Sequence, residues 1–474
     1  MNPHEEIKLL EQALLLISAK AREFNLDFYD MFFEICPADI IYTFGAYSMP
    51  TRYSHWTFGK AYHKMKTQYD YNLGRIYEMV INSDPCYAFL LEGNTLIQNK
   101  LVMAHVLAHC DFFKNNAYFK KTSTNMVESM AAAADRFRGY EFKYGRARVE
   151  SFIDAAIAIQ EHIEPRDLKK NVKAAEPEQG NSGRTGRLAT PYGDLWSIDA
   201  EAGDDPESLA KKKRFPEEPE KDLVMFIIQH SKELEDWQRD IMSVIRQEML
   251  YFWPQMETKI MNEGWASYWH LRIMREMELD ESEAVEFAKM HSGIIQTSRI
   301  RLNPYALGLK IFEDIEKRWD QPTPEEKEKY GRPGGQGREK IFEVRAVDND
   351  ISFLRNYLTR ELVEDMDLYL YKKAGYDWKI SDKEWEKVRD TIVNSLTNCG
   401  YPHIVVQDGD FNKRGELYLK HNYEGTELDV VYLEKTLPHV YTLWGRPAHL
   451  ETMLDDRPVL FSYNGEKSNK MFLY

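Results

Sequence analysis

Two histidines four residues apart, His105 and His109, are the side chains of this sequence best spaced to bind a metal ion. They lie in Thr95–Asn116, where Thr95 and Gln98 form a capping box and predict the start of a helix. Because a helix has 3.6 residues per turn, both imidazoles project from one face, as in many helical metal sites. The same spacing also occurs when two histidines are simply buried in a helical core.

A second segment, Asn262–His270, has the sequence NEGWASYWH and also lies in a helical context. Glu263 and His270 share one face of that helix, at positions i and i+7. A carboxylate that faced two imidazoles would complete a tetrahedral site of two histidines and one glutamate, with the fourth position open to water. In the alternative interpretation Glu263 is an ordinary helix carboxylate, and the glycine and tryptophans of the segment are packing residues.

Together the two segments resemble the zinc aminopeptidase pattern, in which HExxH on one helix is completed by a glutamate in an N-E-G-aromatic-A helix. The resemblance implies that His105, His109 and Glu263 bind zinc or another divalent metal, in a metallopeptidase-like (gluzincin-like) helical core. Val106 stands where those enzymes carry the glutamate that takes the proton from the attacking water. The sequence therefore leaves open a different base, or a site without hydrolytic power.

Three residues are candidates for the missing catalytic group. Glu92 follows the apolar run Cys86–Leu91, a predicted strand, and directly precedes the histidine helix. Asp111 lies two residues after His109, about 200° around the helix, so support of a metal ligand or a hydrogen bond to another helix is favoured over direct metal ligation. His270 could donate to a developing oxyanion from the opposite wall of the site.

The composition describes a large acidic chain with a sizeable core. Of its 474 residues, 43% are hydrophobic and 29% charged, which excludes a wholly disordered protein. The net charge of −15 argues against a nucleic-acid partner. The four cysteines contain no CxxC pair, so neither a disulfide framework nor a thiolate zinc site is encoded. No apolar run approaches the ~18–20 residues of a membrane span, and we expect a cytoplasmic protein.

Changes in composition divide the chain into four parts. Residues 1–165 are predicted to be mostly helical, and residues 166–222 form an exposed low-complexity insertion rich in Lys, Glu, Pro and Gly. Residues 223–396 are again helical and share the core of the first part. Residues 397–474 change to short β-type runs around one helical stretch, which predicts a small α+β module. The expected fold class is mostly α with this C-terminal module.

Over nearly its full length the chain resembles the stage V sporulation protein R (SpoVR) family. The stretches that carry the resemblance are Phe33–Lys66, Glu78–Asn116, Glu218–Ile227, Leu234–Glu248, Tyr251–His270 and Leu433–Met453. The resemblance implies a role in spore cortex (peptidoglycan) formation, or in stress and stationary phase outside spore-formers. It also implies partnership with a PrkA-type serine kinase and a von Willebrand-like protein encoded in the same operon.

Two hypotheses for function remain at this point. In the first, a zinc site of His105, His109 and Glu263 activates water to hydrolyse an amide in peptidoglycan or its precursors. In the second, the same residues form a metal site without catalytic activity, and the acidic chain is a scaffold or effector of the kinase system. Val106 favours the second hypothesis, and the ionisable residues in otherwise apolar helices favour the first.

Overall fold

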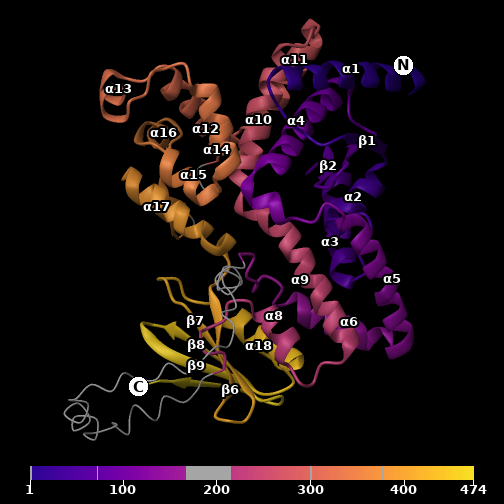
Figure 1. The fold of residues 1–474 in the computed structure, drawn as a ribbon, viewed down its shortest axis with the longest axis vertical. Helices are drawn as coiled ribbons and strands as arrows, with labels where there is room; N and C mark the ends of the chain where they lie inside the picture. The colour runs from indigo at the N-terminus through magenta and orange to yellow at the C-terminus, as the bar shows by residue number, and fades with distance from the viewer. Residues whose placement is uncertain (1–2, 72, 167–214, 299–300, 376, 474) are drawn as a thin grey trace, which may run out of the picture. The chain divides into compact units, whose positions relative to one another are not determined.

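The structure is a computed structural model that describes residues 3–71, 73–166, 215–298, 301–375 and 377–473. Most of the predicted insertion 166–222 lies outside the described residues. The chain packs as two compact units (Figure 1): Met1–Glu150 with Gln247–Tyr401, and Ser151–Arg246 with Pro402–Tyr474. Helices dominate and a five-stranded sheet lies near the C-terminus, which confirms the prediction of a mostly α chain with a C-terminal α+β module.

The first unit contains the predicted site. Its N-terminal elements are α1 (Pro3–Glu23), β1 (Met31–Cys36), α2 (Ala38–Tyr47), α3 (Trp56–Asp70), β2 (Glu78–Ile81), β3 (Cys86–Leu91), α4 (Leu96–Asn115), η1 (Ala117–Lys121) and α5 (Met126–Tyr144). The later elements are α10 (Lys259–Arg275), α11 (Glu281–Ile294), α12 (Pro304–Asp320), α13 (Pro324–Tyr330), α14 (Gly337–Val347), α15 (Asp350–Tyr357), α16 (Arg360–Asp365), β4 (Leu370–Ala374), β5 (Asp377–Asp382), α17 (Trp385–Leu396) and η3 (Thr397–Gly400). Helices α6 (Arg146–Ile157) and α9 (Asp236–Glu257) carry residues of both units.

Helices α4 and α10 pack side by side in the centre of the first unit, and both are buried almost all round. Helix α4 begins with the predicted capping box: Gln98 N donates to Thr95 Oγ1, and Thr95 N donates to the Gln98 side chain. Helix α10 begins at the buried carboxylate of Asp350, which accepts from Ile260 N at 2.8 Å and Met261 N at 2.9 Å. These contacts fix where each helix starts, and therefore which residues reach the site.

Helices α10 and α12 approach so closely that glycine is required on both. A Cβ on Gly264 would lie 2.9 Å from Leu309 N and closer still to the backbone of Gly308. A Cβ on Gly308 would in turn meet the backbone of Ile260 and Gly264. The backbone of α10 next to Glu263 is thus set by direct packing against α12.

A three-stranded sheet of order β1-β3-β2 precedes α4 in the chain. Strand β1 runs parallel to β3, and β2 is antiparallel to it, with Glu78 opposite Leu90. Strand β3 coincides with the apolar run that predicted a strand at Cys86–Leu91. A short turn joins β2 to β3, and their antiparallel pairing places Glu78, at the start of β2, beside the end of β3.

The second unit is built on a sheet of order β10-β9-β8-β7-β6. Its elements are α8 (Leu223–His230), β6 (Ile404–Phe411), β7 (Glu416–His421), α18 (Val430–Trp444), β8 (Ala448–Leu454), β9 (Arg457–Tyr463) and β10 (Ser468–Phe472). Only β7 and β8 are parallel among these strand pairs, and α18 makes the crossover between them. Residues 223–246, expected in the helical core, belong to this unit because α8 contacts β6 and Glu220 pairs with Val406.

No helix within the described ranges is long and apolar enough to span a membrane.

Candidate metal centre

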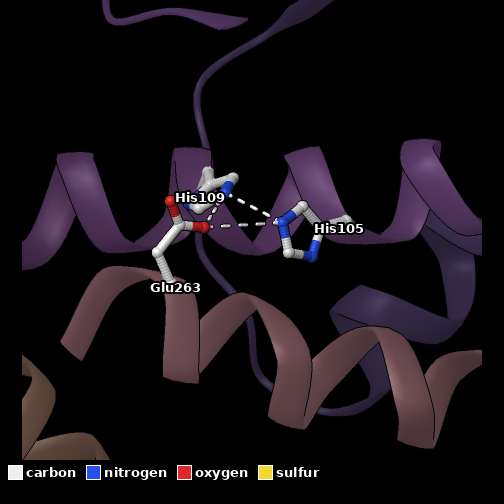
Figure 2. A group of neighbouring side chains, drawn as sticks. All are labelled: His105, His109 and Glu263. Carbon is white, nitrogen blue, oxygen red and sulfur yellow. Dashed lines mark hydrogen bonds and ion pairs between the residues drawn. The ribbon is translucent and has the colours of Figure 1, made fainter. Parts of the chain in front are cut away.

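The three predicted metal ligands lie together between α4 and α10. Figure 2 shows the imidazoles of His105 and His109 on α4 facing the carboxylate of Glu263 on α10. The two Nε2 atoms are 3.1 Å apart, and Glu263 Oε2 lies 3.5 Å from His109 Nε2 and 3.9 Å from His105 Nε2. The point equidistant from these three atoms is about 2 Å from each of them, close to the ~2.0–2.2 Å bonds of zinc to histidine and carboxylate.

The surroundings of the three ligands leave donor atoms facing the centre. His109 Nδ1 lies 2.9 Å from Asn262 Oδ1, which places the proton on Nδ1 and leaves the Nε2 lone pair facing the centre. Burial, together with the neighbouring His109 and His270, lowers the pKa of His105 well below its usual range, so this ring is neutral. Glu263 Oε2 is buried and accepts no hydrogen bond from the described residues. A buried carboxylate oxygen without a donor is unfavourable, and a bound cation would remove that cost.

His270 lies behind His105, on the side away from the centre. The Nδ1 atoms of the two rings are 2.9 Å apart, and His270 Nε2 lies 2.9 Å from His291 Nδ1 on α11. His270 is fully buried, and burial lowers its pKa to about 3. His270 is therefore a neutral hydrogen-bonding partner that orients the His105 ring. It contacts Nδ1 of that ring, whereas Glu263 lies near Nε2 on the opposite edge.

A pocket of about 600 Å³ opens onto His105. Its polar lining includes two residues that the sequence analysis did not single out, Glu78 at the start of β2 and Tyr305 in the first turn of α12. Burial and the charge of Glu263 raise the pKa of Glu78 to about 7. Burial and the charges of Glu263 and Glu78 raise the pKa of Tyr305 far above its usual range, so its hydroxyl stays protonated. The Tyr305 ring stacks with its centroid 6.1 Å from that of His105.

Comparison with known proteins identifies the relatives of this chain. The family model described as SpoVR like protein matches residues 4–401, and the one described as SpoVR-like C-terminal domain matches residues 402–455. This chain belongs to the SpoVR family. The chain is 28% identical to the uncharacterized protein YcgB of Escherichia coli (strain K12), over 96% of this chain and 94% of that protein. No solved structure matches it.

In this SpoVR-family chain, Asp111 ties helices together. Its carboxylate accepts from Trp265 Nε1 at 2.8 Å and from Asp27 N at 2.7 Å, and it lies 3.3 Å from Arg345 Nη1. Asp111 is fully buried, and burial raises its pKa to about 6. Trp265 lies on α10 and Arg345 on α14, so Asp111 bonds to other helices. Its position about 200° around α4 from His109 points it away from the metal centre. The partners occupy both carboxylate oxygens, so Asp111 acts on the site by fixing α4 against α10 and α14.

Glu92 lies in the turn that follows β3 and is exposed. Its backbone N–H donates to Cys36 O, and within the described part of the chain no hydrogen bond or ion pair joins its carboxylate to the three ligands. The structure thus places Glu78, rather than Glu92, in the pocket that opens onto His105. No spacing rule points to Glu78, because it reaches the pocket through the pairing of β2 with β3. For Tyr305, the sequence Asn303-Pro304 predicts the start of a helix. It does not predict that this helix end packs beside His105.

Proposed function

We propose that this SpoVR-family protein is a metal-dependent amide hydrolase, with zinc or another divalent ion bound by His105, His109 and Glu263. One observation carries the proposal: the Nε2 atoms of two histidines meet a buried carboxylate oxygen that has no hydrogen-bond donor among the described residues, and one of these histidines, His105, also lines an open pocket. The ion would polarise a water molecule and the substrate carbonyl, which is the chemistry that such sites supply.

Glu78 is the general base in this proposal. Its pKa of about 7 leaves a large fraction of the carboxylate ionised at neutral pH, and a base of that strength can both take the proton of water and return it to the leaving amine. Val106 is fully buried in α4, so the position used by HExxH enzymes offers no base here. A carboxylate from strand β2 therefore takes the role that the helix does not provide.

Tyr305 stabilises the oxygen that becomes negative as the amide is attacked. Its hydroxyl remains protonated because burial and two nearby carboxylates oppose its ionisation. A protonated phenol held in a pocket wall is a pre-oriented hydrogen-bond donor, which is most useful where charge develops during the reaction.

The family association with spore cortex formation supports peptidoglycan or one of its precursors as the substrate, acted on in the cytoplasm. A gluzincin-like core is part of this proposal and rests on the resemblance of the two ligand segments to the zinc aminopeptidase pattern, with the two ligand helices α4 and α10 packed together. The second candidate function is a metal-binding scaffold for the PrkA-type kinase and its von Willebrand-like partner, and the apolar Val106 in place of the usual glutamate is the observation that favours it.

The test combines metal analysis with an assay of muropeptide cleavage. We expect His105→Ala to lose both metal and turnover, and Glu78→Gln to keep its metal while turnover falls by about two to four orders of magnitude. Glu92→Gln is the matched control, since it removes an exposed carboxylate, and it should change neither. A Glu78→Gln protein with full turnover contradicts the assigned base. The scaffold is favoured if the wild type binds metal but cleaves no amide, and if the His105→Ala variant no longer forms the complex with the kinase.

A further inference from the structure

The pocket above His105 also has features that specify a class of substrate. We infer, resting on the proposed function, that it binds a short peptide with an apolar side chain and a free carboxylate, and that Lys289 pairs with this carboxylate. A volume of about 600 Å³ suits a ligand of small-molecule size and is too small for a folded protein.

The middle of the pocket is apolar. Helix α4 contributes Leu101 and Val102, and helix α11 contributes Met290 and Ile294. Leu101 and Val102 are each at most 3% exposed, so they form a firm wall beside His105. Apolar side chains in this position favour a substrate residue of the same character next to the scissile amide.

Among the described residues that line the pocket, Lys289 provides the one positive charge. It is exposed on α11, and no ion pair of its ammonium occurs among the residues that the structure describes. The nearby acids of α11 are engaged elsewhere: Glu283 pairs with Lys100, and Glu286 accepts from Thr95 Oγ1. Lys289 is therefore available to a ligand, and together with a divalent ion it disfavours a substrate with a positively charged end.

Gly293 keeps the pocket open. It lies one turn after Lys289 on α11, and a Cβ added there would meet nothing within 4 Å. The first atom of a side chain at this position therefore meets no obstacle. Gly293→Phe adds a large side chain to the pocket lining, and Gly293→Ala is its control.

The experiment measures binding by calorimetry, with and without metal. The probes are N-acetyl-Leu-Ala with a free carboxylate and the same peptide as its carboxamide. We expect the wild type to prefer the carboxylate by about tenfold, since a hydrogen bond between charged groups is stronger than a neutral one and exposure of Lys289 weakens it. Lys289→Met should abolish the preference, Lys289→Arg should keep it, and Gly293→Phe should weaken both peptides while Gly293→Ala does not.

The outcomes separate this inference from the proposed function. Equal binding of the two peptides, no binding of either, or a preference that survives Lys289→Met overturns the inference. A Lys289-dependent preference in a protein that binds no zinc or cleaves no amide supports the inference and overturns only the hydrolase. Circular dichroism of each variant confirms that it is folded, so a loss of binding reports on the pocket.

Discussion

Gly264→Ala should damage the metal centre without touching a ligand. The new Cβ would lie 2.9 Å from Leu309 N and closer to the backbone of Gly308, whereas carbon atoms pack at about 3.5–4.0 Å. Since the nearest obstacle is the Gly308 backbone, α10 and α12 must separate by roughly 1–1.5 Å to restore that spacing. Glu263 directly precedes Gly264, and its carboxylate moves with the helix by more than the ~0.2 Å that metal geometry tolerates.

The expected magnitude follows from two opposing effects. Overpacking of this kind costs about 3 kcal/mol, at the upper end of its range because backbone cannot turn aside, and the better helix propensity of alanine returns about 1 kcal/mol. The net loss in the free energy of unfolding is therefore about 2 kcal/mol, and we expect zinc affinity to fall about 10- to 100-fold, as when other supports of metal ligands are altered.

The assay is guanidinium denaturation of the apo protein, followed by zinc titration against a competing chelator. Gly293→Ala is the matched control, because its Cβ meets open space: it should keep wild-type zinc affinity and lose no stability, with a gain of up to about 1 kcal/mol from the helix propensity of alanine. If Gly264→Ala unfolds at the wild-type midpoint and binds zinc equally well, the close contact between α10 and α12 does not position Glu263.

Three further predictions concern buried charge. The pKa of Asp350 is raised by burial to about 7, above its unfolded value of about 3.9, so the folded state binds more protons and stability falls as the pH rises between these values. Asp350→Asn should reduce that slope in denaturation curves measured from pH 4 to 8. Arg345→Met leaves the Asp111 carboxylate buried without its charge partner, and we expect a loss of about 3 kcal/mol in the same assay; Asp111→Asn in addition should recover part of it. Because the pKa of Glu78 is about 7, wild-type turnover should rise with pH up to this value and then level, and the residual turnover of Glu78→Gln should lack this step.

The sequence could predict the parts of the site that depend on one helix at a time. The capping box at Thr95 and the i, i+4 spacing of His105 and His109 are local features, and the structure has both. Glu263 could be paired with them only through the resemblance to a known motif. The helix crossing at Gly264 that holds it near them depends on residues of α12 much later in the chain.

Residues that reach the site through the sheet could not be found in this way. Glu78 lies at the pocket because β2 pairs with β3 and the pocket also takes residues from α4, α11 and α12. The packing of this strand pair beside helices far along the chain is a non-local property that no spacing in one segment encodes. Cys86 and Cys110 show the same limit. They are distant in the sequence, yet their sulfur atoms lie 3.2 Å apart, where β3 packs against α4.

The separation of α4 from α10 along the chain also affects how the protein is made. Glu263 follows His109 by 154 residues, so a ribosome working at ~5–20 residues per second exposes the two histidines roughly 8–30 s before the carboxylate. During that interval the nascent chain carries α4, a helix with apolar side chains on every side, and its partner helix does not yet exist. The first unit must therefore complete its core after most of the polypeptide has been synthesised, and until then α4 is a natural target for chaperones that bind exposed apolar segments.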